Sequence, residues 1–258
     1  MMQKRNSYYS REGIYGNMEE YIDIHSHILP GIDDGAKNFE MSMEMLQIAQ
    51  ENGIKAIILT PHHKPMGHNA GAEKIRTLAG QLQERAGQAG LEIKLYTGNE
   101  FYYSSEMVGE LEEKRVCTMA DSDYVLVEFG PMDGMEHIRG GLYQVLSAGY
   151  RPILAHVERY ENVCKDVGRV EDLIAMGCYI QVNGGSILGK YGLGVKQMLR
   201  KLLKKKLVHF VATDAHSSGK RSPEMAECAH YLQKRYGEEY TDRLLRVNPS
   251  QIIANRYI

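Results

Sequence analysis

The segment Tyr21-Ile-Asp-Ile-His25-Ser-His27 sets the pattern for the whole chain. It is a short run of β-branched and apolar residues that ends on side chains able to bind a metal ion. We count seven short apolar runs of this kind, and the later ones end near Thr60, Gly98, Glu128, His156, Asn183 and Asp214. Longer segments with the periodicity of an amphipathic helix separate them. This alternation predicts an α/β fold with a mainly parallel sheet, either doubly wound or closed into a barrel.

The clearest predicted helix runs from Phe39 to Glu51. Asn38 precedes it as a candidate N-cap, and Gly53 follows just past its end. No linker rich in Pro, Gly or Ser, no low-complexity stretch and no internal repeat divides the 258-residue chain. We therefore expect one domain over residues 21–258, preceded by a polar N-terminal extension over residues 1–20.

Composition excludes several classes of function. The formal net charge of −2 gives no broad attraction to nucleic acid or to an anionic membrane. The basic run Lys204-Lys205-Lys206 follows apolar residues at helical spacing, so we expect it on the solvated face of a helix. No stretch approaches the roughly 20 consecutive apolar residues of a membrane span, and the first residues lack the apolar core of a secretory signal. The four cysteines form no CxxC pair, so a reducing, cytoplasmic location is expected.

Metal-competent side chains gather at the predicted strand ends. In parallel α/β folds the carboxyl ends of the strands meet at one face, where ligands bind. His25 and His27 share one side of an extended segment, as do Asp214 and His216, so each pair can reach a single ion. The candidate metal ligands are His25, His27, Asp34, His62, Glu100, Glu128, His156, Asp214 and His216. Imidazole and carboxylate suit Zn²⁺, Mn²⁺ and Fe²⁺, and this many ligands predicts a cluster of two or three ions that share carboxylates.

Each of these residues has an ordinary explanation when taken alone. A single His at a strand end can be a structural hydrogen-bonding residue, a lone acid can cap the next helix, and Asp33-Asp34-Gly35 can be simply a turn. The recurrence at nearly every strand end favours the metal cluster. The remaining histidines fall outside the pattern and are interpreted as structural or surface residues: His63, His68, His137, His209 and His230.

The motifs resemble a known superfamily. The run Asp23-Ile-His-Ser-His-Ile-Leu-Pro-Gly-Ile-Asp-Asp-Gly-Ala36 resembles the opening of the PHP (polymerase and histidinol phosphatase) superfamily, and it is most similar to the bacterial manganese-dependent tyrosine-protein phosphatases of capsule and exopolysaccharide operons. The resemblance continues from Tyr21 to the C-terminus. Its later motifs are Thr60-Pro-His-His, Gly98-Asn-Glu100, Val127-Glu128-Phe, Ala155-His-Val-Glu-Arg-Tyr160, Asn183-Gly-Gly-Ser, Gly189-Lys-Tyr-Gly and Thr213-Asp-Ala-His216.

The resemblance implies a distorted (β/α)₇ barrel and a division of the ligands among three ions. One ion would be held by His25, His27, Glu100 and Asp214; a second by Glu100, Glu128 and His156; a third by Asp34, His62 and His216. Arg159 and Arg221 match the phosphate-binding arginines of the family, and manganese is the implied metal, with iron or zinc as alternatives. The chain departs from the family at its front, where residues 1–20 are additional.

The implied activity is hydrolysis of phosphotyrosine on a protein, most simply a bacterial tyrosine kinase that controls capsule or exopolysaccharide synthesis. Three alternatives stay open: a small-molecule phosphomonoesterase such as a histidinol-phosphatase, a nuclease or polymerase-associated phosphodiesterase, and a non-catalytic PHP scaffold. Tyr8, Tyr9 and Tyr15 add a separate hypothesis, that the extension is itself phosphorylated or docks a kinase tail; a solvated arm is the simpler interpretation.

Overall fold

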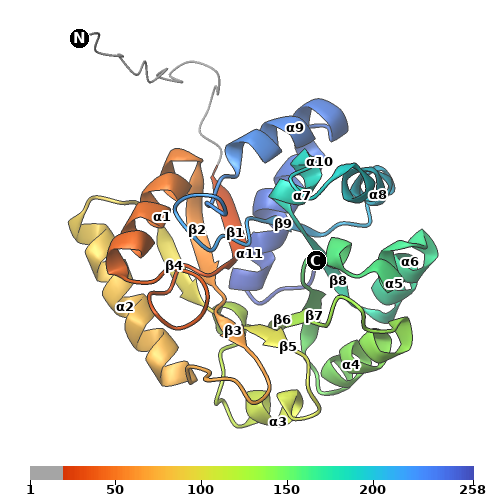
Figure 1. The fold of residues 1–258 in the computed structure, drawn as a ribbon, viewed down its shortest axis with the longest axis horizontal. Helices are drawn as coiled ribbons and strands as arrows, with labels where there is room; N and C mark the ends of the chain where they lie inside the picture. Colours follow the sequence, from red (N-terminus) through yellow and green to blue (C-terminus); the bar gives the residue numbers. More distant parts are fainter. Residues whose placement is uncertain (1–19) are drawn as a thin grey trace, which may run out of the picture.

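A ring of parallel strands surrounded by helices forms the fold (Figure 1). The computed structural model describes residues 20–258. Its strands are β1 (Tyr21–Ser26), β2 (Ile54–Leu59), β3 (His62–His63), β4 (Lys94–Thr97), β5 (Glu100–Tyr102), β6 (Tyr124–Glu128), β7 (Arg151–Leu154), β8 (Tyr179–Asn183) and β9 (Phe210–Ala212). Its α-helices are α1 (Phe39–Glu51), α2 (Ala72–Gln88), α3 (Met107–Glu112), α4 (Met135–Ser147), α5 (Glu161–Cys164), α6 (Val167–Met176), α7 (Gly184–Leu188), α8 (Leu193–Lys204), α9 (Ala226–Tyr236), α10 (Glu238–Asp242) and α11 (Asn248–Ile253). Shorter helical turns are η1 (Met119–Asp121) and η2 (Val157–Arg159), and a π-helical turn, η3 (Arg243–Val247), precedes α11.

Two curled sheets make up the ring. One has the order β1-β2-β4 and the other β3-β5-β6-β7-β8-β9, and every pairing within them is parallel. The ends of β1 and β9 also join, since the His27 amide donates to the Ala215 carbonyl at 2.8 Å and the Asp214 amide donates to the His25 carbonyl at 2.9 Å. The predicted α/β fold with a distorted seven-stranded barrel is confirmed.

The second and third predicted strands correspond to β2 and β4, and each is followed by a further short strand, β3 and β5, which the sequence pattern did not reveal. Pro61 separates β2 from β3 because proline has no N–H to donate to a ladder. Asn99 separates β4 from β5, and its side-chain amide donates to the Pro61 carbonyl at 3.0 Å. After these breaks β3 pairs with β5, and His62 becomes the register partner of Glu100. The irregularity therefore places two candidate ligands side by side.

The strands bury alternate side chains on the two sides of the ring. Ile24, Ile58, Leu126 and Phe210 form an inner apolar cluster, which includes Ile252 of α11. Alternating partners such as Ile57, Val125, Val127 and Val211 belong to the outer cluster beneath the helices. The apolar interior holds the strands rigidly, and the polar residues lie at their carboxyl ends.

Two predicted helices are confirmed. Helix α1 spans Phe39–Glu51, and the Asn38 side chain caps it by accepting a hydrogen bond from the Met41 amide at 3.0 Å. Helix α8 buries Leu199, Leu202 and Leu203 and exposes Lys201 and Lys204. Apart from Glu20, the predicted extension and its three tyrosines lie outside the described residues. Within the described part of the chain, no helix combines the length and apolar character required to cross a membrane.

Candidate metal centre

All nine predicted metal ligands lie at the carboxyl ends of the strands and contact one another. His25 is in β1 and His27 just beyond it, His62 is in β3, Glu100 in β5 and Glu128 at the end of β6. His156 follows β7, Asp214 and His216 follow β9, and Asp34 lies on the loop after β1. Most of these side chains are buried, whereas 63% of the Asp34 side chain is exposed. The site is thus deep, with one carboxylate at its open side.

Four residues form the innermost group: His25, His27, Glu100 and Asp214. The Nε2 atoms of His25 and His27 lie 3.3 Å apart. His25 Nε2 is 3.2 Å from Glu100 Oε1 and 3.5 Å from Asp214 Oδ1. His27 Nε2 is 3.4 Å from Glu100 Oε2 and 3.6 Å from Asp214 Oδ1. These donor atoms converge from β1, β5 and the end of β9.

Glu100 also connects to a second group. Its Oε1 lies 2.8 Å from His156 Nε2, which is 3.4 Å from Glu128 Oε1. On the other side, His62 Nδ1 lies 2.8 Å from Glu100 Oε2 and 3.7 Å from Glu128 Oε2. Glu100 therefore contacts four histidines and occupies the centre of the cluster.

Asp34 joins a third group at the mouth. Its Oδ1 lies 3.3 Å from His62 Nε2 and 3.5 Å from His216 Nε2. The ring of His216 also packs against that of His27 in a tilted arrangement, with 3.8 Å between centroids. Ligand atoms of His27, Asp34, His62 and His216 all lie within 4.8 Å of one another.

Two buried ligand atoms fit divalent ions better than they fit hydrogen bonds. His62 Nδ1 and Glu100 Oε2 face each other without a hydrogen-bond geometry, and neither has another hydrogen-bond partner. Such orphaned buried atoms are rare unless a cation satisfies them. The set of imidazole and carboxylate donors is the one used by Zn²⁺, Mn²⁺ and Fe²⁺ sites.

The other ring nitrogen of three histidines is held by the protein. His25 Nδ1 lies 3.2 Å from Gln181 Oε1, His27 Nδ1 lies 2.8 Å from Asp33 Oδ2, and His216 Nδ1 lies 2.9 Å from the Asp214 carbonyl. A hydrogen bond donated from Nδ1 leaves the Nε2 lone pair aimed into the cluster. The protein therefore fixes both the orientation and the tautomer that binding a metal requires.

The cluster is also electrostatically coupled. Burial alone would lower the pKa of His27, but the neighbouring carboxylates of Asp33 and Glu100 raise it to about 10. Burial would also lower the pKa values of His62 and His156, but the neighbouring carboxylates raise both values to about 9. Burial would raise the pKa of Glu100, but the charge of His25 and hydrogen bonds from the imidazoles hold it well below its ordinary value. Positive charge among the carboxylates is thus strongly stabilised.

Two of the site residues have a positive φ angle, a backbone conformation that residues other than glycine rarely adopt. His156 has φ of 31° and Asp214 has φ of 52°. Neighbouring groups hold both: the His156 amide donates to Gln181 Oε1 at 2.7 Å, and the Asp214 amide donates to the His25 carbonyl. Such conformations persist where the surrounding structure over-determines them, as is common in functional sites.

The two predicted phosphate-binding arginines both contact Asp214. The Arg159 guanidinium donates to Asp214 Oδ2, and Arg221 Nη2 lies 2.9 Å from the same oxygen. Asp214 thus directs Oδ1 to the histidines and Oδ2 to the arginines. Both arginine side chains are about one-third exposed, so they line the entrance to the cluster.

Comparisons with known proteins place the chain in a family. Residues 21–254 match the family described as capsular polysaccharide synthesis, CpsB/CapC. The chain belongs to this CpsB/CapC family. It is 34% identical to the tyrosine-protein phosphatase CpsB of Streptococcus pneumoniae over 242 residues, covering 92% of this chain and all of that protein. It is 32% identical to the tyrosine-protein phosphatase YwqE of Bacillus subtilis, with 92% and 93% of the two chains covered.

Solved structures agree with this membership. A crystal structure from work on YwqE and CpsB, described there as unique metal-dependent tyrosine phosphatases, superposes with a TM-score of 0.86 at 31% identity and covers 92% of this chain and 96% of that one. A histidinol phosphate phosphatase from Lactococcus lactis has a TM-score of 0.55 at 16% identity over 84% of this chain and 94% of that one. At that identity it supports only the shared barrel fold.

Three residues that orient the site in this CpsB/CapC member were not predicted: Asp33, Gln181 and Asn183. Gln181 serves both His25 and His156, and Asn183 Nδ2 donates to Asp214 Oδ2 at 2.8 Å. Asp33 accepts from the His62 amide at 3.1 Å besides its contact with His27. Asn183 lies at a predicted strand end and Gln181 lies two residues before it. This position is the feature of the sequence that could have identified them as site residues. Nothing in the sequence distinguishes the role of Asp33 from that of Asp34.

The histidines interpreted as structural lie apart from the candidate metal groups of residues 20–258. His63 Nε2 contacts Glu110 Oε2 at 2.9 Å, and His137 packs edge-on against Tyr103 and Phe129. His209 Nδ1 accepts a hydrogen bond from the Ile180 amide.

Proposed function

We propose that this chain is a metal-dependent protein-tyrosine phosphatase. The observation that carries the proposal is the Glu100 carboxylate, which is buried with histidines from separate strands around both of its oxygens. The relatives that cover nearly the whole chain are named tyrosine-protein phosphatases, which supports the same activity here.

The nine ligands would hold two or three divalent ions. His25, His27, Glu100 and Asp214 would hold one; Glu100, Glu128 and His156 would hold a second; and Asp34, His62 and His216 would hold a third. Manganese is our preferred metal, although the same donors suit iron and zinc. His27 and His62 each face two of the groups, so they are well placed to bind either of two neighbouring ions.

Divalent ions bound here would supply a water nucleophile at neutral pH and positive charge for the phosphoryl group. The chain's own residues would position the substrate. Arg159 and Arg221 stand at the entrance, and arginine can bind two phosphate oxygens at once. Their shared contact with Asp214 orders both guanidinium groups before a phosphate arrives. Phosphoryl transfer depends mainly on such positioning and charge neutralisation.

The substrate we propose is phosphotyrosine on a protein, in particular a bacterial tyrosine kinase of capsule or exopolysaccharide synthesis. The description of the family, capsular polysaccharide synthesis, supports this setting. Histidinol phosphate is the alternative substrate. Parallel assays with a phosphotyrosyl peptide and histidinol phosphate separate the two, because the peptide should be hydrolysed with the higher kcat/KM.

Substitution of the central carboxylate tests the site. Glu100→Gln removes the charge that Glu100 shares between two ion sites while keeping its size. We expect phosphate release to fall by about 10³-fold or more, equivalent to about 4 kcal/mol, together with a loss of bound metal. Glu110→Gln is the matched control, since Glu110 pairs with His63 outside the cluster.

Metal content also tests the scaffold alternative. Purified protein should bind more than one divalent ion per chain and should lose turnover on chelation. Near-normal turnover by Glu100→Gln would mean that the site is misplaced, and a chain that binds no metal would support a scaffold.

A further inference from the structure

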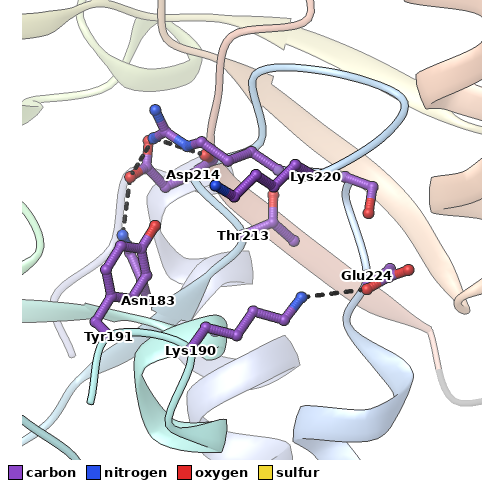
Figure 2. Close-up of a pocket in the computed structure, with 10 residues that line it drawn as sticks. Asn183, Lys190, Tyr191, Thr213, Asp214, Lys220 and Glu224 are labelled. Atoms are coloured by element: carbon purple, nitrogen blue, oxygen red, sulfur yellow. Dashed lines mark hydrogen bonds and ion pairs between the residues drawn. The ribbon is translucent and has the colours of Figure 1, made fainter.

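A surface pocket adjoins the metal centre beside Asp214. It lies between the segment that follows β8 and the loop that follows β9 (Figure 2). The pocket is lined by Asn183, Gly185, Lys190, Tyr191, Thr213, Asp214, Lys220, Arg221, Ser222 and Glu224. Arg221 belongs both to this pocket and to the proposed phosphate site. A substrate whose phosphate contacts Arg221 therefore extends naturally toward the pocket.

The charges in the pocket do not balance. The outer oxygen of Asp214 already contacts Arg159 and Arg221. Glu224 has its own cation, since Lys190 Nζ lies 3.3 Å from Glu224 Oε2. Among the described residues, no carboxylate lies within ion-pair distance of the Lys220 ammonium. Figure 2 shows the Lys220 side chain reaching over Thr213 toward the Asp214 side of the pocket. One positive charge is therefore left for a ligand.

Tyr191 forms another wall of this pocket. Its side chain is half exposed. An exposed aromatic face beside the proposed phosphate site suits the ring of a phosphotyrosine. The residues next to that phosphotyrosine in an extended peptide would then lie only a few ångströms away, at about 3.3–3.6 Å per residue.

We propose that this pocket binds an acidic side chain adjacent to the phosphotyrosine in the substrate, and that Lys220 is the residue that selects it. This inference rests on the proposed phosphatase function and specifies its substrate class: phosphotyrosyl segments with Glu or Asp beside the modified tyrosine. Lys190 supports the site by neutralising Glu224, which would otherwise repel an incoming carboxylate. Lys220 acts on binding and takes no part in the chemical step.

Two phosphotyrosyl peptides that differ only by Glu or Gln beside the phosphotyrosine test the proposal. Manganese-loaded wild-type protein should hydrolyse the Glu peptide with a kcat/KM higher by about two- to fivefold, mainly through KM, as expected for a partly exposed ion pair. Lys220→Gln should bring the ratio of the two kcat/KM values to about one. Lys220→Glu should invert the ratio and favour a third peptide that carries Lys at the same position.

Lys94→Gln is the matched control. Lys94 is an exposed lysine at the amino end of β4, on the opposite end of the barrel from the site, so this variant should keep the wild-type ratio. Thermal melting curves of all variants verify that they fold. Equal kcat/KM for both peptides with wild-type protein, or an unchanged ratio in Lys220→Gln, would overturn the inference and leave the phosphatase proposal standing. Failure of the wild-type protein to hydrolyse either peptide would instead overturn the phosphatase proposal itself.

Discussion

At the residue scale, the site depends on side chains that touch its histidines from behind. Asp33 and Gln181 contact the Nδ1 atoms of His27 and His25. Gln181 in addition accepts from the His156 amide and donates to Asn183 Oδ1 at 2.8 Å. One amide group thus links three segments of the site. Such partners orient metal ligands and raise their basicity, so removing a partner lowers the affinity for the metal.

Asp33→Asn tests this dependence. The substitution keeps the shape of the side chain but removes the charge that faces His27 Nδ1 at 2.8 Å. We expect binding of Mn²⁺ to weaken by about 10- to 100-fold. Isothermal titration calorimetry measures the affinity directly.

The control for this substitution is Asp121→Asn, because Asp121 pairs with Arg76 on the surface. Its Mn²⁺ affinity should equal that of wild-type protein. An unchanged affinity in Asp33→Asn would show that His27 is oriented by packing alone.

At the scale of elements, the loop after β1 is built around a close approach. The Ala36 amide donates to the His27 carbonyl at 3.0 Å, which folds the loop back on the strand. Gly35 lies so near that a Cβ added to it would come within 2.0 Å of the His27 carbonyl oxygen. The obstructing atom is backbone, so it cannot move away by a change of rotamer. Only glycine fits at position 35, which directly follows the candidate ligand Asp34 and lies against the backbone of the candidate ligand His27.

Gly35→Ala should therefore destabilise the fold by about 1–3 kcal/mol, the usual cost of overpacking, and should displace His27. Urea unfolding monitored by circular dichroism gives the free energy of unfolding. Gly80→Ala is a control for which the free energy of unfolding should rise instead of fall, because Gly80 lies within α2 with open space around it. That substitution should stabilise the protein by about 0.5–1 kcal/mol. A stable Gly35→Ala variant with normal metal content would contradict this account.

At the scale of the whole molecule, the sequence predicted the order of the strands and helices better than it predicted how the strands close into a barrel. Seven strand runs and α1 follow directly from periodicity and capping residues. The short strands β3 and β5, which follow Pro61 and Asn99, were missed because two and three residues are too few to show a strand periodicity. Eight of the nine candidate ligands were predictable because they sit at or just beyond a predicted strand end, whereas Asp34 lies further along the loop after β1. Asp33 was not predictable, because its role depends on which way one loop turns.

The amino-terminal side of the barrel contains a partly buried titrating group that links stability to pH. His209 lies just before β9, and its Nδ1 accepts a hydrogen bond from the Ile180 amide at 3.1 Å. Burial lowers the pKa of His209 from 6.5 to about 4. The unfolded chain therefore takes up a proton before the folded chain does, so the free energy of unfolding falls as pH drops from about 6.5 to about 4. Above pH 6.5 this contribution to stability is fully present.

His209→Asn isolates the effect, because the Asn side-chain oxygen can accept from the Ile180 amide but does not titrate. Other groups also change protonation in this range, so the informative quantity is the difference between wild type and variant. Between pH 7 and pH 4.5 the wild-type free energy of unfolding should fall further than that of the variant, by on the order of 2 kcal/mol after allowance for solvent screening. Urea unfolding at several pH values measures both curves. Parallel curves would mean that His209 takes up its proton in the folded protein as readily as in the unfolded chain.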